Sequence, residues 1–286
     1  MSKVIENNDW DLVITPKAKW FQLGLADLWR YRDLLLLLVK RDFKATYKQT
    51  ILGPIWLIIQ PVLTSLTFTI IFGTIAGMST DGVPKILFYL AGITLWTYFA
   101  DCLTKTSTTF TANANIFGKV YFPRLIIPLS VLVSNLIKLA VQFCIFISVW
   151  MYFLLTEQQI QPHWEVIWLL PVLVALMAGL GLGAGIFISS LTTKYRDLTF
   201  LVGFGVQLLI YASSIVLPIS TMSARAQEIM LMNPIVPIIE TFKYIFLGKG
   251  FFSVASLAYS AVFMLVQLFI AVVVFSRVEK SFMDTV

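Results

Sequence analysis

Residues 104–130 read TKTSTTFTANANIFGKVYFPRLIIPLS, and they form a long interruption between apolar stretches that keeps a helical pattern of its own. Its apolar side chains recur at i, i+1, i+4 and i+5, a spacing that places them on one helical face. These residues are Ile116, Phe117, Val120 and Tyr121. Asn113 and Asn115 can cap the start, and Pro123 cannot continue a helix. The pattern therefore predicts a short amphipathic helix that ends near Phe122.

Two interpretations of this helix remain open from the residues alone. Amphipathic helices between membrane spans commonly lie on the lipid headgroups. A helix of this kind can also dock into another protein, in which case the docking face comprises Asn115, Ile116, Phe117, Val120 and Tyr121.

The composition indicates a polytopic membrane protein of the all-α class. Of its 286 residues, 58% are hydrophobic and only 13% are charged, whereas soluble domains carry about 25% charged residues. Apolar runs near the roughly 20 residues that a membrane helix needs predict six transmembrane helices. They lie at about 55–76, 86–103, 126–155, 166–191, 200–217 and 254–276. No removable signal peptide is expected, since the first long apolar run begins after residue 50.

The basic residues sort by membrane side. Six spans place both termini on one side, and that side receives sixteen Lys and Arg against four on the other. The excess predicts that both termini and the segment 104–125 face the cytoplasm. The protein is expected to lie in the cytoplasmic membrane. Because the net charge of +6 is explained by this sorting, it gives no reason to expect a nucleic-acid partner.

The regions before and after the spans are expected to be cytoplasmic. Residues 1–19 are a polar tail, residues 20–50 predict an amphipathic interface helix, and residues 281–286 are a short tail. The apolar run 34–39 is too short to cross the bilayer. Tryptophan and tyrosine suit the headgroup zone, and the lysines and arginines of this helix can meet anionic lipids. Residues 51–280 then form the transmembrane domain.

Residues 218–252 predict an extracytoplasmic re-entrant hairpin. Their apolar core, residues 229–247, is interrupted by prolines and contains two charged residues, features that argue against a simple span. The candidate outer-gate residues are Asn233, Pro234, Glu240 and Lys243. Since Glu240 and Lys243 are three residues apart, they can pair along one helical face. Their role is either a gate or mutual neutralisation.

Polar and aromatic stripes mark the first and fifth predicted spans. The first comprises Gln60, Thr64, Thr67 and Thr74, and the fifth comprises Phe200, Phe204, Gln207, Tyr211 and Ser214. Such stripes commonly bond neighbouring helices together. They can instead line a channel in which aromatic faces carry sugar rings. Both interpretations remain open.

The sequence lacks the common motifs for binding nucleotides and metal ions. No phosphate-binding G-x-x-x-x-G-K-[ST] loop occurs, and no cluster of metal ligands is evident, so we expect neither a nucleotide nor a metal cofactor in this chain. The glycine run 179–185, GLGLGAG, lies within an apolar span and indicates close helix packing.

A set of short motifs resembles a known family. They are Tyr47, Leu52-Gly53, Trp56 and Pro61 at the first span, Phe122-Pro123-Arg124 after the amphipathic helix, Tyr195-Arg196-Asp197 between the fourth and fifth spans, and Asn233-Pro234 in the hairpin. In order and position they resemble the permease subunit of type-2 ABC transporters that export polysaccharides such as O-antigen, capsule and teichoic acid. The chain departs from the pattern at Lys243, where the family more often has arginine.

The resemblance implies a homodimer of this chain with two copies of a separate ATP-binding subunit, which binds ATP and magnesium. The substrate is expected to be a lipid-linked glycan, most readily O-antigen or a related surface glycan. By the same resemblance, residues 111–122 form a coupling helix seated on the ATP-binding subunit, and the interface helix shapes the cytoplasmic entry.

Other functions fit the sequence less well. An ABC-type exporter of another lipid or of a drug keeps the same architecture. A secondary transporter usually places acidic or histidine relays in its spans, and these spans hold almost none. A membrane-embedded glycan-processing enzyme needs a general acid, base or metal cluster, and none converges in the sequence.

Overall fold

The computed structural model describes residues 29–48, 53–113, 116, 122–156, 160–192, 195 and 197–281. Within these ranges the chain forms helices and turns without strands, which confirms the all-α class. The elements are α2 (Arg32–Tyr47), η1 (Gly53–Ile55), α3 (Trp56–Phe68), η2 (Thr69–Ile75), α4 (Lys85–Ser107), α5 (Thr109–Ala112), α7 (Ile126–Thr156), η3 (Trp164–Leu169), α8 (Leu170–Thr192), α9 (Leu198–Leu209), η4 (Ile219–Thr221), α10 (Ala224–Leu231), α11 (Ile235–Leu247) and α12 (Val254–Ser281).

Five of the six predicted spans are continuous helical segments. In the described part of the chain, five segments are long and apolar enough to cross a membrane. They are Gly53–Ile75, Lys85–Ser107, Ile126–Thr156, Trp164–Thr192 and Val254–Val278. The chain is therefore a multi-pass membrane protein, as its composition predicts.

The prediction of one helix over residues 200–217 is wrong beyond Leu209. The apolar helix α9 has 12 residues and reaches only about 18 Å at 1.5 Å per residue, short of the roughly 30 Å hydrocarbon core. Residues 210–217 continue as turns. Ser214 lies in this unwound segment with φ +56°, a left-handed conformation that a helix cannot contain.

The predicted hairpin region folds into two helices that meet at a sharp angle. The axes of α10 and α11 differ by 107° across a short break. A bend of this size fits a re-entrant element or a broken span, and the re-entrant topology stays a prediction. Pro234 stands at the break, before the first helical residue of α11.

The helix α4 forms the centre of the bundle, because α8, α7, α3, α11 and α9 all pack against it. The glycine run of α8 permits this packing on two faces. A Cβ atom on Gly185 would lie 2.6 Å from the Thr106 Cβ of α4. A Cβ atom on Gly183 would lie 3.3 Å from Gln267 of α12. The predicted close packing of this run is thus confirmed.

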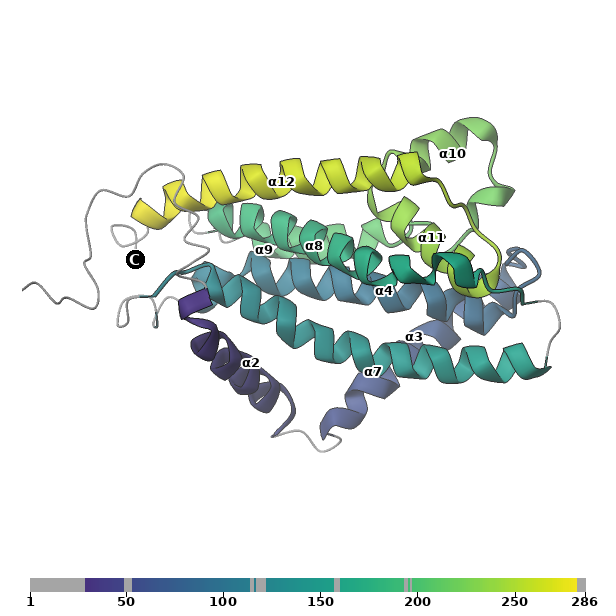
Figure 1. Cartoon of the computed structure of the whole chain (residues 1–286), viewed down its shortest axis with the longest axis horizontal. Helices are drawn as coiled ribbons and strands as arrows, with labels where there is room; N and C mark the ends of the chain where they lie inside the picture. Colours follow the sequence, from purple (N-terminus) through teal and green to yellow (C-terminus); the bar gives the residue numbers. More distant parts are fainter. Residues whose placement is uncertain are drawn as a thin grey trace, which may run out of the picture.

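The two ends of the molecule are built differently. Figure 1 shows α2 and the C-terminal end of α12 at one end, and the bent pair α10 and α11 at the other. In α2, Leu38 and Val39 are buried, whereas Leu36 and Leu37 point outward and are exposed. The helix therefore packs one face on the bundle. Residues 20–28 of the predicted interface helix lie outside the described residues.

Candidate functional site

The predicted docking helix falls almost entirely outside the described residues. This holds for Asn115, Phe117, Val120 and Tyr121, whose role stays a prediction. Ile116 is described, and it packs on a buried apolar cluster of its own chain. That cluster comprises Leu38, Phe110, Phe122, Ile126, Ile127, Ile186, Ala271 and Phe275. Ile116 thus contributes to packing within this chain.

Asn113 caps a different helix from the one expected. It follows the last residue of α5, and its side-chain Nδ2 donates to the Thr109 carbonyl at 3.0 Å. The side chain therefore bonds to the end of the preceding helix. Phe122 and Pro123 lie outside any helix, as the proline predicts.

The polar stripe of the first span lies on a weakly covered surface. Gln60, Thr67 and Thr74 are exposed, and Thr64 is half-buried. The hydroxyls donate to their own helical segment: Thr64 to the Gln60 carbonyl at 2.9 Å and Thr67 to the Leu63 carbonyl at 2.8 Å. Because the backbone satisfies these hydroxyl donors, the stripe can face a partner or a conduit without a bond to another helix of this chain.

The stripe of the fifth segment divides into an exposed part and a buried part. Phe200 is 82% exposed, and Phe204, Gln207 and Tyr211 are also exposed. The ring of Tyr211 meets that of Phe72 edge to face, with centroids 6.3 Å apart. The unwound end of the fifth segment is therefore adjacent to the π-helical turn η2 of the first span.

Ser214 belongs to a buried charged network rather than to an exposed stripe. Glu240 and Lys243 are each 1% exposed, and the Lys243 Nζ lies 3.0 Å from the Glu240 Oε1. The Ser214 hydroxyl donates to the same Oε1, and the Lys243 ammonium donates to the Ser214 carbonyl. The predicted Glu240–Lys243 pair is confirmed, and it holds the unwound segment against α11. We call Ser214, Glu240 and Lys243 the buried triad.

Two further contacts stabilise the charges of the buried triad. The Phe251 backbone N–H donates to the second carboxylate oxygen of Glu240 at 3.2 Å. The Lys243 ammonium lies 4.1 Å from the centroid of the Phe88 ring of α4, within cation–π range. Sequence reasoning identified the two charges by their spacing. It missed Ser214, Phe251 and Phe88 as their partners, because these residues are brought together only by the tertiary fold.

The Asn233-Pro234 motif joins three elements. The Asn233 side chain donates to the Ala212 carbonyl of the unwound segment at 2.8 Å and accepts from the Ile235 N–H at 3.1 Å. The Pro234 carbonyl accepts from the Ser260 hydroxyl of α12 at 2.8 Å. The motif thus fixes the start of α11 relative to the fifth segment and α12.

The carbonyls at the C-terminal end of α11 are satisfied by two distant aromatic residues. The Trp150 indole of α7 donates to the Phe246 carbonyl at 2.7 Å. The His163 backbone N–H donates to the Ile245 carbonyl at 2.9 Å, and the imidazole stacks on Tyr244 with centroids 4.0 Å apart. The His163 side chain is partly buried. Its partners lie about 80 residues away, so local sequence carried no signal for them.

These features define a class of protein: a multi-pass membrane protein that has, at one end, a buried helix hydrogen-bonded to an unwound segment. Among the described residues there is no group of three side chains able to hold a metal ion. The sequence pattern of the ABC-2 type transporter family matches residues 33–247. The chain belongs to this family.

Curated relatives match along most of their length. An O-antigen export system permease protein of Klebsiella pneumoniae is 26% identical over 253 residues, which cover 88% of this chain and 94% of the relative. One of Myxococcus xanthus is 26% identical and covers 78% and 83%. A polysialic acid transport protein of Escherichia coli is 24% identical and covers 86% and 93%.

Proposed function

We propose that this chain is the permease subunit of an ABC exporter that moves a lipid-linked polysaccharide, such as O-antigen, across the cytoplasmic membrane. The observation that carries the proposal is the match to the family over residues 33–247, with relatives similar over nearly their whole length that are named for polysaccharide export. The multi-pass architecture supports it.

The partners follow from this proposal. The chain forms a homodimer and binds two copies of an ATP-binding subunit, which carry ATP and magnesium. Both termini lie in the cytoplasm, where residues 111–122 couple the subunits. Nucleotide binding in the partner pushes this segment and moves the bundle above it.

The proposed conduit runs along the first and fifth segments. Aromatic and amide side chains, among them Phe204, Gln207 and Gln60, are exposed there, and such groups stack on sugar rings and exchange hydrogen bonds with them. At the far end, α11 is almost entirely buried and is fixed by the buried triad. Opening this end requires the unwound segment to move relative to α11.

Coexpression with the cognate ATP-binding subunit tests the function and the coupling role together. We expect the two chains to copurify at equal stoichiometry in mild detergent and, in proteoliposomes, to move a lipid-linked glycan only with ATP. Substituting Phe117 and Tyr121 by alanine is expected to abolish export while ATP turnover persists. The single variant Ile116→Ala is the comparison. Because Ile116 packs on its own chain, its truncation should lower the stability of the chain rather than uncouple ATP turnover from export.

The outcomes separate the alternatives. A chain that purifies without any nucleotide-binding partner contradicts the ABC assignment. ATP-dependent movement of a lipid or drug without movement of a glycan supports the ABC exporter assignment and contradicts the proposed substrate. Normal export by the double alanine variant contradicts the coupling role of residues 111–122.

A further inference from the structure

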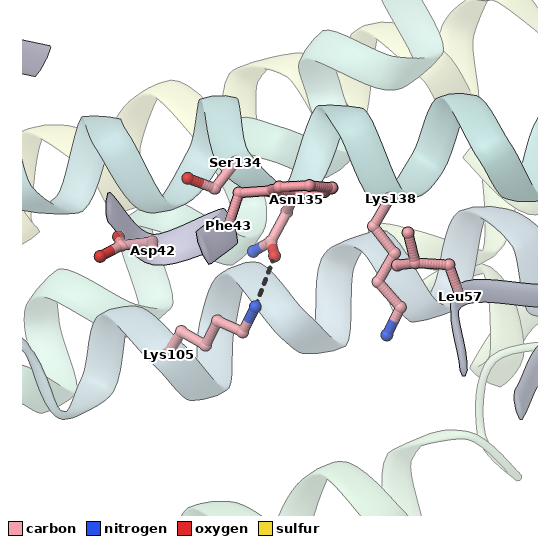
Figure 2. A pocket seen from close by; sticks show the side chains of 7 residues that line it. All are labelled: Asp42, Phe43, Leu57, Lys105, Ser134, Asn135 and Lys138. Carbon is pink, nitrogen blue, oxygen red and sulfur yellow. Dashed lines mark hydrogen bonds between the residues drawn. The ribbon is translucent and has the colours of Figure 1, made fainter. Parts of the chain in front are cut away.

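A small pocket lies between four helices near the α2 end of the molecule. It is lined by Asp42 and Phe43 of α2, Leu57 of α3, Lys105 of α4, and Ser134, Asn135 and Lys138 of α7. Figure 2 shows Lys105 and Asn135 pointing toward each other across the pocket, with Phe43 and Ser134 beside them. Three polar side chains on α7 and a lysine from α4 thus line one pocket beneath the amphipathic helix.

The polar groups of the pocket are tied into a network with positive charge in excess. The Lys105 Nζ donates to the Asn135 Oδ1 at 2.9 Å. Lys138 pairs with Asp101 at 2.8 Å, and Asp42 pairs with Arg41 at 2.8 Å. After these two ion pairs, the Lys105 charge has a neutral amide as its hydrogen-bond partner in this network. An ammonium has three donors, so Lys105 can bind a further acceptor.

The Ser134 hydroxyl lines the pocket with a hydrogen-bond donor that the other described residues do not use. Its Oγ is shielded from solvent and has no hydrogen-bond partner among the described residues. Buried polar atoms in proteins are nearly always hydrogen-bonded to protein, water or ligand. A hydroxyl and an ammonium in one pocket form a set of donors suited to an anion.

The depth of the pocket selects the kind of anion. The helix α7 has 31 residues and is about 46 Å long, so it exceeds the hydrocarbon core by roughly 16 Å. Ser134 and Asn135 follow its first residue by less than three turns, and Lys105 lies in the last turn of α4. The pocket therefore lies near the end of α4 and the start of α7, where a lipid headgroup can approach it, with Phe43 and Leu57 as its apolar wall.

We propose that this pocket binds the phosphate group of a membrane lipid. Lys105 and the Ser134 hydroxyl donate to the phosphate, and Asn135 positions the lysine through its amide oxygen. Phe43 and Leu57 contact the apolar part next to the phosphate. Two sources share this chemistry: a bulk phospholipid of the membrane, and a polyprenyl phosphate of the kind that carries glycans. The binding site itself does not depend on the proposed export function.

Native mass spectrometry of the full-length chain in mild detergent tests the site. The probes are phosphatidylglycerol, undecaprenyl phosphate and a diacylglycerol with the same acyl chains as the phosphatidylglycerol. We expect Lys105→Gln to weaken binding of at least one phosphate lipid about tenfold, since a charge-assisted hydrogen bond is lost. Lys105→Arg should retain most of the affinity. Diacylglycerol, which has no phosphate, should bind weakly to all variants.

Two further variants control for unspecific charge effects and for folding. Lys249→Gln removes an exposed charge that lies outside both α2 and the pocket and should change affinity less than twofold. Ser134→Ala removes the buried hydroxyl without a change in charge and should weaken binding several-fold. A melting temperature equal to that of the unmodified chain shows that the fold is intact.

Each outcome decides a point. If Lys105→Gln weakens the binding of phosphatidylglycerol alone, the pocket is a site for bulk lipid. If it weakens the binding of undecaprenyl phosphate alone, the pocket is a carrier-lipid site. Equal binding by Lys105→Gln and Lys249→Gln overturns the proposal. So does tight, unchanged binding of diacylglycerol.

Discussion

At the scale of single residues, the buried triad holds the unwound part of the fifth segment in place. The Ser214 carbonyl accepts from the Lys243 ammonium and the Ser214 hydroxyl donates to the Glu240 carboxylate, so the charged pair bonds the turn that follows α9 to α11. Unwound backbone is tolerated at membrane depth only where protein covers it, and Ser214 is buried. The pair is thus a structural part of the α10–α11 end of the bundle.

Removing one member of this pair should damage the fold more than removing both. Lys243→Met leaves the Glu240 carboxylate buried without its cation, and such losses typically cost about 3–5 kcal/mol. We expect the single variants Lys243→Met and Glu240→Leu to lower the midpoint of thermal unfolding in detergent. The double variant Glu240→Leu with Lys243→Met should have a higher midpoint of thermal unfolding than Lys243→Met alone, because no unpaired charge stays buried.

The double variant also separates stability from function. Because it no longer bonds Ser214, we expect altered export even where the unfolding midpoint recovers. Simple additivity of the two single effects on the midpoint contradicts energetic coupling between Glu240 and Lys243.

At the scale of elements, the contact between α8 and α4 depends on the absence of side chains. A Cβ atom on Gly185 would lie 2.6 Å from the Thr106 Cβ and 3.0 Å from the Leu103 carbonyl oxygen, so the helices must separate. Gly185→Ala is expected to destabilise the protein by about 1–3 kcal/mol, measured as a lower unfolding midpoint. Gly205→Ala is the matched control, since a Cβ atom there meets nothing within 4 Å. Equal midpoints for the two variants would show that α8 and α4 adjust without cost.

Elements with a continuous pattern could be predicted from the sequence, and those interrupted by tertiary contacts could not. Five spans have uniform apolar runs, and the glycine run of α8 indicates its own packing. The fifth segment stays mostly apolar up to Leu217, but its helix ends at Leu209, and the unwound part is bonded through Ser214 to distant charges on α11. Trp150 and His163 likewise meet the end of α11 only through the fold. Periodicity reports neighbours three or four residues apart and is blind to these partners.

At the scale of the whole molecule, the weakly covered helices present two kinds of surface. The first span and α12 are each only 17% buried, so both face lipid, a second copy or a conduit. The first span and the fifth segment carry the polar and aromatic stripes, whereas the exposed side chains of α12 include Val262, Leu265 and Val266. Because polar groups are costly against lipid, we expect the stripes to face water or sugar and α12 to face lipid.

Thiol labelling distinguishes these surfaces. Single cysteines at Thr67, Phe204 and Val262, in a background without Cys102 and Cys144, are exposed to a charged thiol reagent in membranes that hold the assembled transporter and ATP. A charged reagent reacts only with thiols that water reaches, because the thiolate is the nucleophile. Labelling at Thr67 and Phe204 should be at least about tenfold faster than at Val262, since charge is excluded from lipid by several kcal/mol. Uniformly slow labelling at all three positions contradicts the conduit and places the stripes against lipid or a second copy of the chain.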